Sequence, residues 1–283
     1  MGKDRNSYSK TDLEATFMRM KEDHMLNGQL KPAYNVQIAV ENYFIVHGYV
    51  SNDRTDYNTL IPVLEKHQKA FGSVLEEMTA DSGYCSEKNL LYLKEKGIES
   101  YIKLQDHEKR KTRAYAEDIS KYYNMRVEVF EDEQFYICHD GRELRHIRTE
   151  TKEQNGYTQT FEVYGCADCS GCEHKARCLY KYNAEKDTER NKVMKINEQW
   201  DELREKSHAN IQSERGILKR QTRSIQTEGH FGDIKENENF RRFNYRSADK
   251  VYKEFMLYAI GRNINKYCRF LNEKLKKFEG KTV

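Results

Sequence analysis

Residues 74–104 constrain the fold of this chain more than any other segment. A short apolar strand over 74–80 is followed by Asp81, by a helix over Glu87–Lys96 that begins after a serine and ends at a glycine, and by a second strand, Ile98–Leu104. Strands joined through a helix are parallel, and the crossover is right-handed. This segment therefore predicts an α/β fold built on a mixed sheet.

The residues before this segment predict further elements of the same domain. Residues 34–50 alternate apolar and polar side chains around a tight turn, which predicts a hairpin. Polar residues precede Leu13–Met25, and we expect a short helix there. Asp56 is placed to cap a helix that runs to about Ala70.

Residues 105–215 have a different character. They contain charged stretches, a predicted meander, a cluster of cysteines and a polar helix near 195–208. After them the pattern is mostly helical to the end of the chain. We therefore predict three parts: 1–104, an insertion over 105–215, and a helical part over 216–283.

Charge is unevenly distributed along the sequence. From Arg215 to the end there are 17 Lys and Arg against eight Asp and Glu, although the whole chain carries only +3. A basic region beside an acidic body favours a polyanionic partner, and a solvated helix surface is the alternative. No apolar run reaches the roughly 18 residues of a membrane helix, and the first residues do not resemble a signal peptide.

Four of the seven cysteines lie within thirteen residues. The odd total and tight clustering argue against a disulfide framework and favour a metal site in a reducing cytosol. Four thiolates at this spacing suit a tetrahedral Zn²⁺, whereas an iron–sulfur cluster and free thiols are alternatives. The cysteines concerned are Cys166, Cys169, Cys172 and Cys178.

Two carboxylates stand in positions suited to chemistry. Asp81 ends an apolar strand and precedes Ser-Gly, where it could bind a metal or simply cap the next helix. Glu228 lies between Arg223 and Lys235 in a charged helical segment. On an α-helix Glu228 and Lys235 would share a face, which suits metal and phosphate binding, or merely a surface salt-bridge ladder.

The order of these motifs resembles the DDE transposases of bacterial insertion sequences, which have a ribonuclease-H-like fold. The resemblance extends over nearly the whole chain and depends on the combination of its motifs. The matching stretches are Ser9–Met18, Tyr34–Val40, Thr79–Tyr84, the cysteine cluster, and Glu228–Lys235 through Phe243.

The resemblance implies roles for individual residues. Asp81 matches the second and Glu228 the third acidic residue of the catalytic triad. The first acidic residue belongs on the first strand of that fold, and nothing here matches it, so we expect that strand to be missing. Asp12 is the nearest upstream carboxylate and is kept as a substitute. The expected contacts to DNA are Arg223, Lys235, Arg241 and Arg242.

The resemblance further implies a function. Residues 1–104 and 216–283 would form the catalytic domain, which cleaves DNA and transfers strands at element ends with Mg²⁺ or Mn²⁺. Because one acidic residue is unaccounted for, activity is uncertain, and an inactive DNA-binding remnant is one alternative. A zinc-stabilised structural or regulatory module is another. The expected partners are DNA and a second copy in a homodimer, in the bacterial cytoplasm at the nucleoid.

Overall fold

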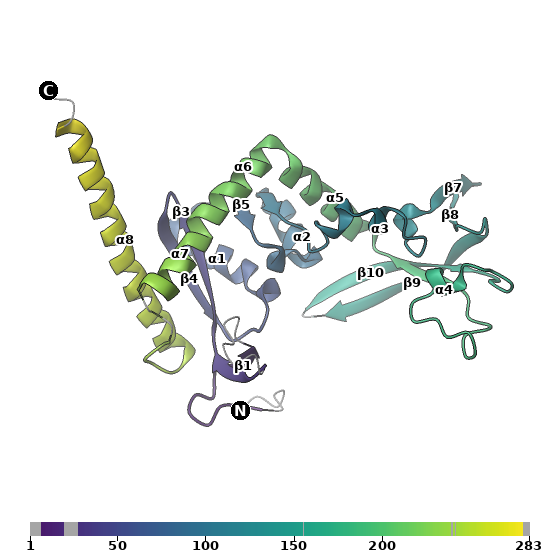
Figure 1. Ribbon diagram of the computed structural model, residues 1–283, viewed down its shortest axis with the longest axis horizontal. Helices are drawn as coiled ribbons and strands as arrows, with labels where there is room; N and C mark the ends of the chain where they lie inside the picture. Colours follow the sequence, from purple (N-terminus) through teal and green to yellow (C-terminus); the bar gives the residue numbers. More distant parts are fainter. Residues whose placement is uncertain (1–6, 20–27, 155, 239, 241, 280–283) are drawn as a thin grey trace. The chain divides into compact units, whose positions relative to one another are not determined.

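The computed structural model describes residues 7–19, 28–154, 156–238, 240 and 242–279 (Figure 1). The chain divides into two compact units. The first contains residues 1–103 and 209–283, and the second contains residues 104–208. Helices and sheets occur in both, so the fold is α/β, as the sequence predicts.

The first unit begins with two antiparallel strand pairs. β1 (Thr16–Arg19) pairs with β2 (Leu30–Ala33), and β3 (Asn35–Glu41) pairs with β4 (Phe44–Ser51). The second pair is the hairpin predicted over 34–50, which is therefore confirmed.

A parallel strand pair follows in the same unit. β5 (Glu77–Ala80) pairs in parallel with β6 (Glu99–Ile102), and α2 (Glu87–Glu95) connects them. The Ser86 hydroxyl accepts a hydrogen bond from the Asn89 amide at the start of α2, so the predicted crossover and its cap are confirmed. The remaining elements here are η1 (Asp56–Asn58), α1 (Leu60–Phe71) and η2 (Ser82–Tyr84).

Two predictions for this unit are wrong. Residues 16–19 lie in a strand rather than in the helix expected over Leu13–Met25, because they pair with β2; residues 20–27 lie outside the described part of the chain. Asp56 does not cap α1 through its side chain, since Thr59 occupies the N-cap position. The Asp56 carboxylate is used elsewhere, as shown below.

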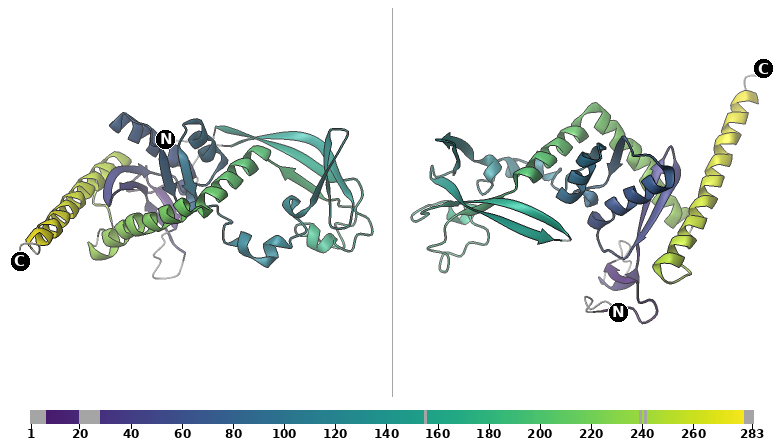
Figure 2. Two further views of the ribbon diagram at one scale, coloured as in Figure 1. Left: turned by 90° about the horizontal axis from the view of Figure 1, so that it is seen from above. Right: turned by 180° about the vertical axis from the view of Figure 1, so that it is seen from behind.

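The second unit contains a five-stranded antiparallel sheet in the order β11-β10-β9-β8-β7. Its longest strands form the β9–β10 hairpin seen in Figure 2. Buried Leu144 and Tyr164 pack with Met125 and Tyr136 in a core on one side of the sheet. The strands are β7 (Arg126–Phe130), β8 (Glu133–Ile137), β9 (Glu143–Gln154), β10 (Tyr157–Cys166) and β11 (Val193–Ile196). The helices before α5 are η3 (Lys109–Lys111), α3 (Arg113–Ala116), η4 (Tyr122–Asn124) and α4 (Lys175–Cys178).

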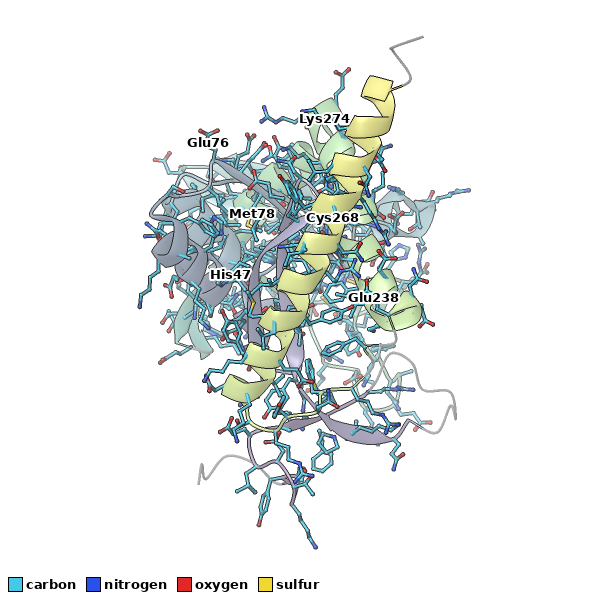
Figure 3. All side chains as sticks on the ribbon, turned by 90° about the vertical axis from the view of Figure 1, so that its left-hand side faces the viewer. His47, Glu76, Met78, Glu238, Cys268 and Lys274 are labelled. Atoms are coloured by element: carbon cyan, nitrogen blue, oxygen red, sulfur yellow. The ribbon has the colours of Figure 1, made fainter. Side chains whose placement is uncertain are left out.

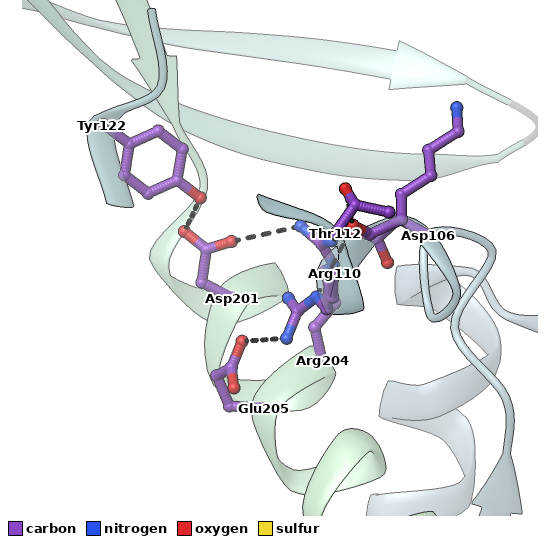
Figure 4. Close-up of polar contacts among 8 residues, drawn as sticks. Asp106, Arg110, Thr112, Tyr122, Asp201, Arg204 and Glu205 are labelled. Carbon is purple, nitrogen blue, oxygen red and sulfur yellow. Dashed lines mark hydrogen bonds and ion pairs between the residues drawn. The ribbon is translucent and has the colours of Figure 1, made fainter. Parts of the chain in front are cut away.

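An ion-pair network attaches the first residues of this unit to helix α5 (Glu198–Gln212), as Figure 4 shows. Asp106 pairs with Arg204 and, at 3.4 Å, with Arg110, and Arg110 also reaches Glu205 at 2.8 Å. Burial raises the pKa of Asp106, but the two guanidinium groups outweigh burial and the net pKa is lowered. This network joins the first residues of the unit to α5 through side-chain ion pairs.

The chain ends in a helical segment of the first unit. It comprises α6 (Glu214–Arg223), the π-helix η5 (Ser224–Glu228), α7 (Gly229–Gly232), the π-helix η6 (Asp233–Asn237) and α8 (Ala248–Glu279). α8 packs on β4, where Gly48 lets Phe255 and Met256 approach closely; a Cβ at Gly48 would lie 2.9 Å from the Met256 sulfur. Across the described residues, every helix is too short or too polar to span a membrane.

Candidate active site

Asp81 lies directly after β5, at the carboxyl end of the parallel pair β5–β6. Its Oδ1 accepts a 2.7 Å hydrogen bond from the Ser82 amide and so caps η2. The side chain is nevertheless 56% exposed. Because of this exposure, Asp81 remains available to a ligand even though it caps η2. Its position also suits ligand binding, since ligands of open α/β sheets bind at the carboxyl ends of the strands.

Helix α6 is held against β5 by basic residues along one of its faces. Arg215 and Lys219 both bond to Glu77 of β5, the first at 2.7 Å. The hydrogen bond from Lys219, with a further contribution from Arg215, keeps the pKa of Glu77 below its usual value. Arg223 continues this face by one more turn and reaches Asp81 just beyond the end of β5.

The π-helix η5 determines where Glu228 lies. On an α-helix, residues five apart are separated by about 140° around the axis and cannot bond to each other. The π-helix instead brings residues i and i+5 together. Arg223 and Glu228 are spaced in this way, and their side chains meet at 3.0 Å. A uniform α-helix through Glu228 and Lys235 was therefore a wrong expectation, because two π-helices replace it.

One guanidinium joins the two predicted acidic residues (Figure 1 shows α6 beside β5). Arg223 Nη2 lies 3.7 Å from Asp81 Oδ2, and Nη1 lies 3.0 Å from Glu228 Oε1. Ser224 Oγ donates to the other Glu228 oxygen at 3.0 Å. Asp81 and Glu228, with 146 residues between them in the sequence, are thus joined through one guanidinium at the surface, which partly balances their negative charges.

A polar network lies behind the Asp81 loop. Asp56 Oδ1 accepts from Asn35 Nδ2 at 2.8 Å and from Gln37 Nε2 at 2.9 Å. The Tyr84 hydroxyl donates to Gln37 Oε1, and burial, followed by the charge of Asp56, raises the Tyr84 pKa. A Cβ at Gly83 would lie 2.8 Å from Asp56 Oδ2. The glycine of the Asp-Ser-Gly motif therefore allows the loop to lie against this carboxylate.

Sequence reasoning missed this network, although one signal for it was present. Asn35 and Gln37 are two residues apart on β3, so both amides lie on the same face of a strand whose other residues up to Val40 are apolar. Amides on a strand face that is partly buried need partners. The position of Asp56 as that partner depends on tertiary structure, which the local pattern does not contain.

Asp12 contacts a different part of the first unit. Its Oδ2 accepts from the Tyr34 hydroxyl at 2.9 Å and from the Ser247 amide at 3.1 Å, next to the start of α8. Glu14 accepts from the Ala248 amide at 2.7 Å. These carboxylates bind the free amides of a helix N-terminus, and the described contacts do not join Asp12 to Asp81 or Glu228.

The remaining predicted DNA contacts lie after Glu228. Lys235 is half-buried on η6, and Arg242 is exposed in the segment between η6 and α8. Arg241 lies outside the described residues. Of the predicted basic residues, Arg223 is the one that the described ion pairs join to the carboxylates.

The four predicted cysteines line one small cavity of the second unit, and Cys138 lines it as well. Cys138 follows β8, so the sequence cluster acquires a fifth thiol from 28 residues upstream of Cys166. The Lys192 amide donates to Cys169 Sγ at 3.4 Å, and Lys192 Nζ donates to the Cys178 carbonyl at 3.1 Å.

The cysteines are free thiols around that cavity. Burial, followed by the neighbouring Cys169, raises the pKa of Cys166 to about 11. Burial likewise raises the pKa of Cys172 and of Cys178. Within the described part of the chain, no three His, Cys, Asp or Glu side chains are arranged so that they could hold one metal ion. This statement applies to the cysteines and to the carboxylates alike.

Comparison with known protein families gives a match to part of the chain. Residues 137–268 match the family model described as a transposase DDE domain. The matched span includes Glu228, Arg223 and the four clustered cysteines, whereas Asp81 precedes it. No curated protein and no solved structure matches the chain significantly.

Proposed function

The chain belongs to the DDE-type transposases, and from this premise we propose that it acts in DNA transposition with Asp81 and Glu228 as two of its acidic catalytic residues. The reaction would be cleavage and strand transfer at the ends of an insertion sequence. The observation that carries the proposal is the contact of one guanidinium with both carboxylates.

A divalent ion fits these residues chemically. DDE transposase domains generally use divalent metal ions, and Mg²⁺ or Mn²⁺ prefers carboxylate oxygens. Asp81 and Glu228 are 56% and 60% exposed, so their oxygens are accessible. When bound, such ions activate the attacking hydroxyl and stabilise the leaving oxygen in phosphoryl transfer. Arg223 contacts both carboxylates and would also bind a phosphate of the DNA.

The strand arrangement supports a ribonuclease-H-like origin for the first unit. Among the described strands, β3 pairs only with β4 and β5 only with β6. Gln37 of β3 nevertheless bonds to Tyr84 of η2, the turn that follows β5, so the two pairs lie close at this end. We propose that they are parts of one mixed sheet of the ribonuclease-H-like kind.

The division of the chain into parts is a proposal of the same kind. We propose residues 1–104 and 216–283 as the catalytic domain and 105–215 as an insertion. The compact unit 104–208 supports this division. Zn²⁺ held by the clustered cysteines would stabilise the insertion. Five cysteines line one cavity, which brings them to one place, but no three of the described side chains are arranged to hold a metal ion as they stand. An iron–sulfur cluster is the other ligand that these thiols could hold.

DNA is the partner that the transposase family implies. We propose Arg223, Lys235, Arg241 and Arg242 as contacts to its phosphates, and association with the nucleoid as the consequence. An inactive DNA-binding remnant is the second candidate. It is favoured by the absence, among the described residues, of a group of three carboxylates that could hold a metal. The comparisons give no support to a purely structural module.

The test uses the full chain with Mn²⁺ and a plasmid that carries the gene with its flanking DNA. We expect nicking at the flanks by the wild type, and none by Asp81→Asn or Glu228→Gln. The matched control is Glu95→Gln, which changes an exposed glutamate of α2 and should leave nicking intact. DNA binding without nicking by any form would favour the remnant. Nicking that survives both substitutions would overturn the assignment of the site.

A further inference from the structure

The turn between β3 and β4 has a strained backbone. Asn42 and Tyr43 have φ values of 48° and 70°, so both lie in the left-handed region. A two-residue hairpin turn of this kind favours glycine at its second position, because a side chain is strained there. This chain has Tyr43 instead, and such strain persists only where the surrounding contacts impose it. One of these contacts comes from Lys266 of α8, whose Nζ lies 4.9 Å from the centre of the Tyr43 ring.

The helical segment that carries Glu228 binds both backbone groups of Tyr43. The Tyr43 amide donates to Gln226 Oε1 at 3.4 Å, and its carbonyl accepts from His230 Nε2 at 2.9 Å. Gln226 of η5 and His230 of α7 are four residues apart, so they lie on the same side of the helix. Glu228 is two residues from each, about half a turn away, and is 60% exposed. The two contacts therefore direct Glu228 away from the hairpin, toward solvent.

The partners of His230 determine which ring nitrogen carries the proton. Nδ1 lies 3.1 Å from Arg262 Nη2, and because a guanidinium can only donate, Nδ1 must accept. Nε2 must then carry the proton, since the Tyr43 carbonyl can only accept. A neutral imidazole with its proton on Nε2 satisfies both contacts. His230 is only 6% exposed, so water does not compete for them.

Arg262 is itself held by two carboxylates. Its side chain is 10% exposed, and it pairs with Asp233 at 3.1 Å and with Glu238. Figure 3 labels Glu238 beside α8, the helix that carries Arg262. His230 therefore bonds on one side to a residue of fixed position and on the other to the hairpin turn.

We propose that His230 is a positioning residue for the transposase reaction, because it fixes the segment that carries Glu228 to the β3–β4 turn. The inference rests on the proposed function and extends it to a residue that does not touch the carboxylates. The amide and carbonyl of one residue are a fixed distance apart, so binding both of them also fixes the winding of the helix between Gln226 and His230. Loss of this contact would let η5 rewind toward an α-helix, in which Glu228 cannot reach Arg223.

Three variants of the full chain test the proposal. His230→Phe keeps a ring of similar size and removes both hydrogen bonds, whereas the amide of His230→Gln can replace both. The matched control is Asn263→Leu, which removes two hydrogen bonds, at 2.8 and 3.0 Å, from α8 to the backbone of Ile45 in the same hairpin. This control leaves the contacts of His230 in place.

Hydrogen exchange measured by mass spectrometry reports on the segment without requiring catalysis. His230→Phe should speed amide exchange over residues 224–237 by about tenfold or more, while the rest of the unit changes no more than in Asn263→Leu. The nicking rate per folded molecule should also fall by about tenfold or more, because a small displacement of a catalytic group slows the reaction strongly. Both quantities should stay within about threefold of the wild type in His230→Gln and in Asn263→Leu.

Unchanged exchange over residues 224–237 in His230→Phe would overturn the proposal. Faster exchange with a wild-type nicking rate would do the same, as would an equal loss of nicking in Asn263→Leu. If the wild type does not nick DNA, the proposed function fails, and the exchange measurement still decides whether His230 holds the segment that carries Glu228.

Discussion

The carboxylates of the first unit and the cysteines of the second differ in how they are placed relative to solvent. Asp81 and Glu228 are exposed and charged, and a guanidinium balances them. Cys166 and Cys169 are buried, and burial raises the pKa of Cys166 to about 11, so this thiol stays neutral. An exposed acidic pair can exchange cations with solution, whereas buried thiols lose protons only to a tightly bound cation.

This difference predicts different consequences when cations are removed. At the carboxylates, a chelator should remove activity and leave the fold intact, because β5 and α6 are joined by protein contacts. At the cysteines, a chelator should weaken the fold itself, because the segment around Cys172 and Cys178 contributes few side chains to the core of its unit.

The largest effect is expected at the cysteines. Cys166→Ser should abolish Zn²⁺ binding and destabilise the second unit by on the order of several kcal/mol, since the binding energy of a structural metal is folding energy. Elemental analysis and calorimetry measure the two effects. The matched control is Cys268→Ser, an exposed cysteine of α8. Purified wild-type chain without zinc, or equal melting temperatures for the two variants, would falsify the prediction.

A smaller effect is expected at Arg223. Its two terminal nitrogens contact different carboxylates, which the single ammonium group of lysine cannot reproduce. Arg223→Lys should lower the nicking rate by about tenfold or more, while stability changes by less than roughly 1 kcal/mol because both carboxylates are exposed. The control is Arg246→Lys, an exposed arginine before α8. Equal nicking rates in both variants would show that the bridge has no catalytic role.

The sequence predicted those parts of the first unit that local patterns determine. The β3–β4 hairpin and the β5–α2–β6 crossover follow from side-chain periodicity and from caps within a few residues. The position of Asp81 directly after β5 was predicted in the same way. Each of these strands pairs with a strand that is close to it in the chain, so the local sequence pattern is sufficient to predict the pairing.

Other features depend on contacts that the pattern does not contain. The π-helix at Ser224–Glu228 departs from the 3.6-residue period on which the helical assignment rested. The strand at Thr16–Arg19 forms because β2 pairs with it, against the local preference assumed for a helix. Asp56 was predicted to cap a helix, but its carboxylate instead accepts hydrogen bonds from the side-chain amides of Asn35 and Gln37, which come close to it only in the folded chain.

Substitution of Asp56 tests the polar network behind Asp81 in the first unit, and we expect an effect of intermediate size. Asp56→Asn replaces an acceptor of two hydrogen bonds by a group that presents a donor, which should cost about 1–2 kcal/mol. Nicking should fall together with stability, because Asp56 supports the loop that carries Asp81. Gly83→Ala, whose Cβ would lie 2.8 Å from Asp56 Oδ2, should give the same decrease in nicking. If both variants nick at the wild-type rate, the network does not position Asp81.

The smallest effect concerns the attachment of α6 to β5. The hydrogen bond from Lys219 lowers the pKa of Glu77, so its ionised form is favoured in the folded state. A carboxyl with a lowered folded pKa stabilises the protein above the unfolded value, and this stabilisation is lost as the pH falls through the folded value. Urea unfolding of the wild type and Glu77→Gln should therefore differ by roughly 1 kcal/mol or less near neutral pH, since Arg215 is largely exposed. The difference should shrink below about pH 4.5, the ordinary value for glutamate, and vanish in stronger acid. A difference that is constant across this range would mean that Glu77 stabilises the fold by packing alone, and that its charge does not hold α6, and with it Glu228, beside Asp81.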